Sequence, residues 1–201
     1  IDIGLYESIF RILDELAPAY QQGGFVRQRM GAGTVNAVPH SHYPTSDGRW
    51  VAIACTNDKI FERLARLMGR SELAGDGVHG TIAKREAARA EVDAMVGAWT
   101  ASMDRAEVLG KCADAQVPCG PVYAIDEIFD DPQYAARGNI ATVPTRVGDM
   151  AMANVMPRLT GTPGSIDWAG RPLGADNEAV FQGLLGLSTE EMAALKAQGV
   201  I

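Results

Sequence analysis

Apolar residues recur every three to four positions in several stretches of this 201-residue chain, which is the spacing of an amphipathic helix. The first stretch, residues 2–21, aligns aliphatic side chains on one face and is followed by two glycines that end a helix. Longer helices are predicted over residues 57–69, where Asn57 is a suitable N-terminal cap, and over residues 81–100. Shorter helices are predicted over residues 104–115 and 125–129, and from about residues 176 and 188 onward. Asp104 with Glu107, and Ser188 with Glu191, have the spacing of a capping box at the start of two of them.

Strand-like runs of β-branched and aromatic residues occur in the first half of the chain. Residues 42–45 and 50–55 flank the turn sequence Ser46-Asp47-Gly48, and this arrangement predicts a β-hairpin. Residues 117–123 contain two prolines and therefore predict an extended connector.

The pattern changes after residue 138. Residues 140–143 and 150–155 predict two further short strands around Gly148-Asp149, and a stretch rich in proline and glycine, residues 160–174, predicts an irregular segment. The order of elements predicts an α/β protein. Its compact part, a hairpin with helices, is expected between about residues 40 and 130.

Composition excludes several classes of protein. The hydrophobic fraction is 47% and the charged fraction is 21%, both typical of a globular chain. Apolar runs are far shorter than the roughly 20 residues of a transmembrane helix, so no membrane association is expected. With 18 basic and 25 acidic residues the net charge is −7, which repels phosphate backbones and argues against nucleic acid as a partner.

Cysteine usage indicates the compartment. Cys55, Cys112 and Cys119 are odd in number and widely spaced, which argues against a disulfide framework and against a zinc site. We therefore expect a reducing, cytoplasmic environment and no bound metal. Cys119 has no histidine or lysine near it in the sequence that would lower its pKa, so we interpret it as a buried structural cysteine rather than a reactive thiol.

The histidines offer limited chemistry. The chain has no P-loop, no dinucleotide-binding fingerprint and no zincin motif. His40 and His42 are two residues apart and would share one face of an extended strand. Such an arrangement would allow them to act as catalytic bases or as two ligands of a metal ion. Because neither cysteine nor carboxylate accompanies them, we favour a packed histidine at a strand entry. His79 lies between glycines and is expected to be solvated.

The best candidate for ligand binding lies in the only net-positive stretch, residues 23–56, which carries three arginines and one aspartate. Within it, Gly31 and Gly33 follow Arg27 and Arg29. Glycines permit close approach of the backbone to a ligand, and arginines neutralise a phosphate or carboxylate. The alternative interpretation, an ordinary flexible connector, is equally consistent with the local pattern.

Five segments together resemble the family III CoA-transferases, the group that includes formyl-CoA transferase, carnitine CoA-transferase and α-methylacyl-CoA racemase. They occur in the order and at the spacing of that family over nearly the whole chain. The segments are YPTSDGRWVAIA (residues 43–54), VPCGPV (117–122), IFDDPQ (128–133), GADN (174–177) and LKAQGVI (195–201).

This resemblance implies a fold and an assembly. The chain would be the C-terminal half of a longer protein whose Rossmann-like large domain is built from both chain ends, and two such proteins would form an interlocked homodimer. Residues 1–38 would be the last helix of the large domain with a glycine-containing crossing loop. Residues 39–130 would form a small α/β domain, and residues 131–201 a linker and the return to the large domain.

The resemblance also implies a reaction. In the family an aspartate, which would lie upstream of this chain, forms a covalent thioester with CoA and passes it from an acyl-CoA to a free carboxylic acid. No catalytic residue is then carried by this chain, no cofactor besides the CoA thioester substrate is needed, and the chain alone would be inactive. The family's glycine-rich loop falls at residues 30–34, so we assign Arg27, Arg29, Gly31 and Gly33 as candidate CoA-site residues.

Three functions remain open at this point. A small di- or hydroxy-acid is the preferred acceptor of a CoA-transferase. An acyl-CoA racemase or isomerase of the same family would instead use an acid/base pair outside this chain. A catalytically silent module that only folds and dimerises is the third.

Overall fold

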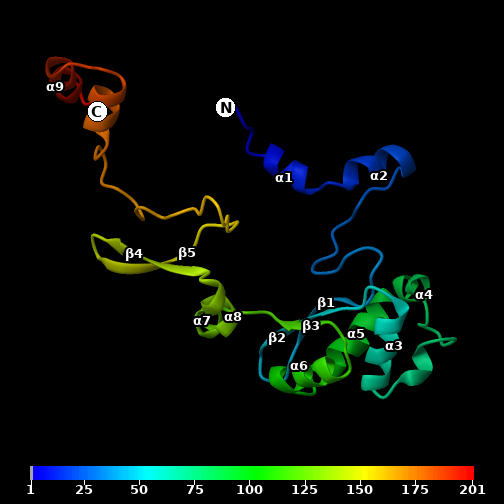
Figure 1. Ribbon diagram of the computed structural model, residues 1–201. Helices are drawn as coiled ribbons and strands as arrows, with labels where there is room; N and C mark the ends of the chain where they lie inside the picture. Colours follow the sequence, from blue (N-terminus) through cyan, green and yellow to red (C-terminus); the bar gives the residue numbers. More distant parts are fainter. Residues whose placement is uncertain (1) are drawn as a thin grey trace. The chain divides into compact units, whose positions relative to one another are not determined.

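The computed structural model describes residues 2–201, and the chain divides into two compact units, Ile1–Val122 and Tyr123–Ile201. The first unit contains a three-stranded sheet with covering helices, and the second contains a two-stranded sheet and short helices (Figure 1). This mixture of helices and small sheets confirms the predicted α/β class.

The sheet of the first unit is antiparallel, with β2 in the middle. The hairpin between its first two strands confirms the prediction made from the turn sequence. Inside that turn the Thr45 hydroxyl donates a hydrogen bond to Asp47 Oδ1 at 2.5 Å, which fixes the reversal of the chain. The strands are β1 (His40–Pro44), β2 (Trp50–Ala54) and β3 (Cys119–Pro121).

Strand β3 is a correction to the sequence analysis, which treated residues 117–123 as a connector only. Cys119 pairs with Ile53, and Gly120 pairs with Ala52. Proline is tolerated in this strand because an edge strand needs ladder donors on one side only. Long-range pairing with β2 therefore decided the structure of a segment that has no strand pattern of its own.

Helices cover one face of the sheet and form the core with it. Tyr43, Val51 and Ile53 alternate along the hairpin and are all at most 3% exposed. They pack into a cluster with buried residues of the helices, each large aliphatic or aromatic side chain contributing about 1.5–3 kcal/mol by burial. The helices that supply this cluster are α3 (Asp58–Leu67), α5 (Arg89–Thr100) and α6 (Arg105–Asp114).

Local capping explains where these helices begin. Asn57 Oδ1 accepts a hydrogen bond from the Ile60 amide at 3.0 Å, and Asp104 Oδ1 accepts one from the Glu107 amide at 2.8 Å. Both caps confirm the sequence prediction. After α3 the chain turns at Gly69, whose φ of +71° suits glycine, and continues into the short 3₁₀ helix η1 (Ser71–Leu73).

The helix predicted over residues 81–100 is divided in two. Helix α4 (Ile82–Ala87) ends at Ala88, whose φ of −113° and ψ of 24° are not helical, and α5 begins at Arg89. The Thr81 side chain caps the first piece by accepting a hydrogen bond from the Lys84 amide at 3.3 Å. The residues around the break include no proline or glycine, so the sequence gives no local sign of it. The apolar pattern therefore predicted one continuous helix.

A fully buried arginine joins the segments around this break. Arg85 is 0% exposed, and its guanidinium donates hydrogen bonds to Val38 O (2.6 Å), His79 O (2.9 Å) and Asp58 Oδ1 (2.8 Å). The guanidinium also stacks on the Phe61 ring at 4.5 Å from its centroid. One side chain thus connects the entry to β1, the loop before α4 and the start of α3.

The N-terminal helix predicted over residues 2–21 is also interrupted. It forms α1 (Glu7–Ile12) and α2 (Leu16–Gly23), separated at Asp14, which has a φ of +39°. Helix α2 ends as predicted, because Gly24 adopts the left-handed conformation. Most of the apolar side chains that predicted the helix are exposed, with Leu5 at 99% and Ile12 at 76%.

The second unit begins with two short helices, α7 (Ile125–Asp130) and α8 (Pro132–Arg137). Asp131 caps α8 by accepting a hydrogen bond from the Tyr134 amide at 3.1 Å, and its other carboxylate oxygen accepts one from the Tyr123 hydroxyl at 2.7 Å. The Tyr123 bond, followed by the backbone bonds, holds the pKa of Asp131 below its ordinary value.

The predicted second strand pair is present as β4 (Ile140–Thr145) and β5 (Gly148–Ala153). Its two-residue turn is Arg146-Val147, so the reversal comes slightly before the predicted Gly148-Asp149. Residues 160–174 contain no helix or strand, as predicted, and the chain ends with the π-helix η2 (Glu178–Leu184) and α9 (Thr189–Ala197).

The capping box predicted at the start of α9 is confirmed. Ser188 Oγ accepts a hydrogen bond from the Glu191 amide at 3.2 Å, and Glu191 Oε2 accepts one from the Ser188 amide at 2.7 Å. Throughout residues 2–201, helices fall short of the length and hydrophobicity needed to cross a membrane. The three-segment division at residues 38 and 130 stays a prediction from family resemblance.

Replacement of Arg85 by alanine should destabilise the first unit strongly. Removing one partner of a buried charge network typically costs about 3–5 kcal/mol, and here two carbonyls also lose their donor. Denaturant unfolding measures the free energy. Arg66→Ala is the matched control, because it removes an exposed arginine paired with Glu62 at 2.9 Å and should cost less than about 1 kcal/mol. Equal losses in the two variants would contradict the assigned role of Arg85.

Candidate functional site

The uncovered face of the three-stranded sheet presents two histidines beside very small residues. Register places His40 opposite Ala54 and His42 opposite Ala52, and Ala52 is paired with Gly120 on the next strand. Side chains two apart share a face, so these five residues lie on the face opposite the core. Because β2 and β3 carry only methyl groups or hydrogen here, the face is hollow between the histidines and the sheet edge.

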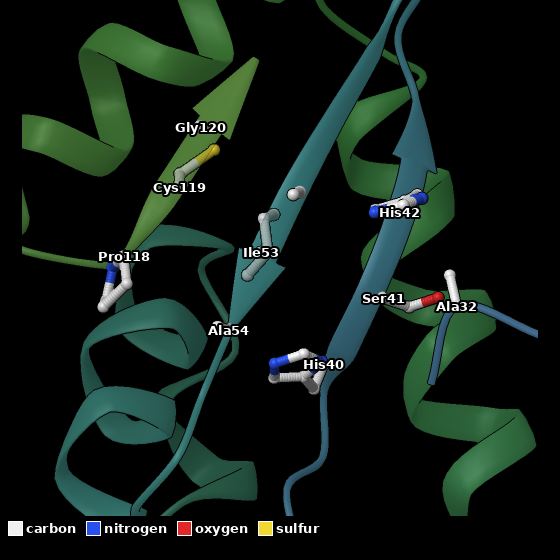
Figure 2. Close-up of a pocket in the computed structure, with 10 residues that line it drawn as sticks. Ala32, His40, Ser41, His42, Ile53, Ala54, Pro118, Cys119 and Gly120 are labelled. Atoms are coloured by element: carbon white, nitrogen blue, oxygen red, sulfur yellow. The ribbon is translucent and has the colours of Figure 1, made fainter. Parts of the chain in front are cut away.

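This hollow is a cavity of about 410 Å³, within the 300–1,000 Å³ range of small-molecule sites. Figure 2 shows the His40 ring extending toward Ala54, while Ala32 lies beside Ser41. Ala32 comes from the predicted glycine segment, so the structure brings that segment to the cavity. The remaining lining residues are Ala52, Ile53, Pro118, Cys119 and Gly120.

The glycine segment forms a tight turn. Gly33 N donates a hydrogen bond to Met30 O at 3.0 Å, and Gly31 has a φ of +60°, which disfavours any residue with a side chain. A Cβ atom at Gly33 would lie 3.2 Å from Met30 O and 3.5 Å from Arg89 Nη1. The turn therefore requires a glycine at position 31 for conformation and leaves little space for a larger residue at position 33.

Side chains from α4 and α5 hold the end of this turn. Arg89 Nη2 donates to Thr34 O at 2.9 Å and Nη1 donates to Ala37 O at 3.5 Å. Glu86 Oε1 accepts a hydrogen bond from the Asn36 amide at 2.7 Å. With Arg85 on Val38 O, these contacts fix the backbone of residues 34–38 at four points just before β1.

The predicted arginines lie at the other end of the turn. Arg27 is exposed, and its Nη2 lies 3.4 Å from Thr34 Oγ1, so it closes the segment on itself. Arg29 is exposed and makes no hydrogen bond or ion pair within residues 2–201. The structure places Gly31 and Gly33 beside the cavity, but the role of all four residues in binding CoA stays a prediction.

The two histidines of the face differ in exposure. His42 is exposed, whereas His40 is half-buried, with a buried Nδ1 atom that has no hydrogen-bond partner among the described residues. Across residues 2–201, no group of three or more histidine, cysteine or acidic side chains is placed to hold a metal ion. The face therefore suits hydrogen bonding by imidazole to a ligand better than metal binding.

The expectation for His79 was wrong. It is 3% exposed, and its Nε2 atom lies 3.4 Å from Glu91 Oε1. Tight backbone packing encloses it, since a Cβ atom at Gly80 would lie 1.8 Å from Gly75 O. The glycines around His79 therefore allow compact packing rather than an open loop.

Sequence reasoning missed the chemical environment of Cys119. Cys112, which lies seven residues earlier at the end of α6, forms a hydrogen bond with it. This bond lowers the pKa of Cys119 and, together with burial, raises that of Cys112. Burial raises the pKa of Cys55 to about 12. Cys119 is only half-buried at the cavity edge, so we expect it to be the most reactive thiol of the three.

Comparison with known proteins agrees with the motifs. The sequence model of the family described as CoA-transferase family III matches residues 1–177. The chain is 46% identical over 202 residues to the succinyl-CoA–L-malate CoA-transferase alpha subunit of Chloroflexus aurantiacus, covering 100% of this chain and 47% of that protein. It is 39% identical over 202 residues to the succinyl-CoA–D-citramalate CoA-transferase of the same organism, covering 100% of this chain and 50% of that protein.

A solved structure shares the fold. The crystal structure of a CAIB/BAIF family protein from Brucella suis aligns with 92% of this chain and 47% of its own, with a TM-score of 0.72 and 30% sequence identity. By sequence, then, the chain is homologous to proteins of the transferase class. It belongs to CoA-transferase family III, as the motifs predicted, and it spans about half the length of the curated relatives it matches.

Loss of the Arg89 anchor should loosen the glycine turn. Hydrogen bonds from a charged donor contribute about 1.5–3 kcal/mol, so Arg89→Ala should reduce amide hydrogen-exchange protection in residues 30–38 by roughly 10- to 100-fold. Mass spectrometry of the corresponding peptide measures this exchange. Arg66→Ala is the control, because Arg66 pairs with Glu62 and not with the turn. This variant should leave the exchange protection of residues 30–38 unchanged. Unaltered protection in Arg89→Ala would show that Arg89 does not anchor the turn.

Cys119 should react first with iodoacetamide, and its reaction should continue to lower pH than that of an ordinary thiol. The reason is that a lowered pKa keeps thiolate present as the pH falls, and thiolate is the reacting form. Peptide mass spectrometry after labelling identifies the site. Cys112→Ala removes the donor and should shift the labelling profile of Cys119 to higher pH, whereas Cys112→Ser keeps a donor and should shift it less. Preferential labelling of Cys55 would contradict this assignment.

Proposed function

We propose that the whole protein containing this chain transfers CoA from an acyl-CoA thioester to a free carboxylic acid. The observation that carries the proposal is 46% identity, over the full length of this chain, to a protein named as a succinyl-CoA–L-malate CoA-transferase subunit. CoA enters as part of the substrate, and no additional cofactor is required.

The acid substrate in this proposal is a small di- or hydroxy-acid. Two relatives at 46% and 39% identity carry L-malate and D-citramalate in their names, together with succinyl-CoA. The cavity beside the glycine turn is small, and two imidazoles border it. Both features suit a short, polar acid better than a long fatty acid.

In the proposed mechanism an aspartate outside the present sequence is the nucleophile. Its carboxylate attacks the acyl-CoA carbonyl and CoA thiolate leaves, which gives a mixed anhydride. The thiolate then attacks the aspartyl carbonyl, which releases the first acid as a carboxylate and leaves an aspartyl thioester. The acceptor carboxylate repeats these two steps in reverse, so the new thioester departs and the aspartate is restored.

The residues of this chain would act on binding and on access of water. The turn at Gly31 and Gly33 would cover the reacting groups, because hydrolysis of an anhydride or thioester intermediate has to be prevented. Arg27 and Arg29 would neutralise phosphate or carboxylate groups of the substrates. The proposed assembly is an interlocked homodimer in the cytoplasm, and the native mass distinguishes it from an assembly of different chains.

A direct assay tests this function. The purified whole protein, given succinyl-CoA and L-malate, should produce a new thioester only when the acceptor acid is present. With acyl-CoA alone, its intact mass should increase by that of CoA less one water, as an aspartyl thioester requires. Exchange of the α-proton of an acyl-CoA for deuterium without an acceptor, and without transfer, would instead establish a racemase. Absence of both reactions would contradict an enzymatic role with these substrates.

A further inference from the structure

We propose that the hollow on the open face of the sheet binds a carboxylate group of the acid substrate, with His40 and His42 as hydrogen-bond donors. This proposal rests on the proposed function and specifies where in this chain the acid is recognised. It goes beyond the glycine turn and arginines that the sequence pointed to, because neither histidine was assigned a ligand.

The shape of the face is the first argument. Ala52, Ala54 and Gly120 leave the space opposite the histidines empty, and a Cβ atom placed on Gly120 would meet nothing within 4 Å. The two imidazoles and the methyl groups therefore border one cavity of about 410 Å³. A short hydrocarbon chain can lie on the methyl groups while its carboxylate reaches the imidazoles.

The chemistry of the lining is the second argument. His40 and His42 both line the cavity, His40 as a half-buried and His42 as an exposed imidazole. A carboxylate offers two acceptor oxygens, which matches two N–H donors two residues apart on a strand. No aspartate or glutamate lines the cavity, so no carboxylate of this chain repels an anion there.

The lining also distinguishes a carboxylate from a phosphate. No lysine or arginine lines the cavity, so nothing there balances a doubly charged phosphate group. Arg89, which lies beside Gly33, is already bonded to Thr34 O and Ala37 O. The CoA phosphates are therefore expected to bind outside this cavity.

The position of the glycine turn connects the cavity with the reaction. Ala32 lies between the two turn glycines and lines the cavity next to Ser41 (Figure 2). A bound acid would therefore contact the turn as well as the sheet. In this arrangement the acid itself orders the segment that covers the reacting groups.

Binding of the acid alone tests the proposal in the whole protein. Calorimetric titration with L-malate and with succinate should show binding, and His42→Ala should raise both Kd values by about 10- to 100-fold, the effect of losing a hydrogen bond to a charged group. His42→Gln, which keeps an N–H donor near the position of Nε2, should recover part of the affinity. The Kd of free CoA should not change.

Controls separate this proposal from folding effects and from the proposed function. His42 is exposed, so its variants should keep the wild-type unfolding midpoint. The acid affinity of His40→Ala is interpreted only if that variant also keeps the wild-type midpoint. Lys59→Ala, on exposed α3 surface outside the cavity, should bind the acids normally. Absent acid binding in the unaltered protein, or unchanged Kd values in His42→Ala, would overturn the proposal. If CoA transfer persists in that case, the proposed function stands without it.

Discussion

The buried guanidinium of Arg85 is the interaction on which the first unit depends. A charge without solvent is costly unless its hydrogen bonds are satisfied, so Val38 O, His79 O and Asp58 must all be in place around it. These partners belong to three segments that are far apart in the sequence. Because all three must bond to the same guanidinium, the entry to β1, the start of α3 and the loop before α4 are held in place together.

The positioning of the glycine turn follows from the same helices. Once Arg85 is fixed, Glu86 and Arg89 on the adjacent turns are directed at the backbone of residues 34–38. One turn further along α5, Asp93 accepts a hydrogen bond from the Tyr43 hydroxyl at 2.6 Å, and burial together with this bond raises the Tyr43 pKa. The helices thus hold both the segment that enters β1 and the strand itself, which is how a flexible glycine sequence acquires a defined place beside the sheet.

The sheet separates structural from chemical roles by its two faces. Tyr43, Val51 and Ile53 are buried on one face, while the residues between them leave the other face with small side chains and imidazoles. This alternation is a direct consequence of strand geometry. The stability of the core and the shape of the cavity are therefore carried by neighbouring residues of the same two strands, and a one-residue shift in register would destroy both.

The sequence by itself determined the local features and the family. Caps at Asn57, Asp104 and Ser188 and the hairpin turn were readable because their chemistry lies within a few residues. Motif order was sufficient for membership of CoA-transferase family III. Tertiary structure alone decided the strand at residues 119–121, the helix break at Ala88, the burial of His79 and the Cys112–Cys119 contact. Each of these depends on atoms distant in the chain, and no local pattern encodes the free energy of such contacts.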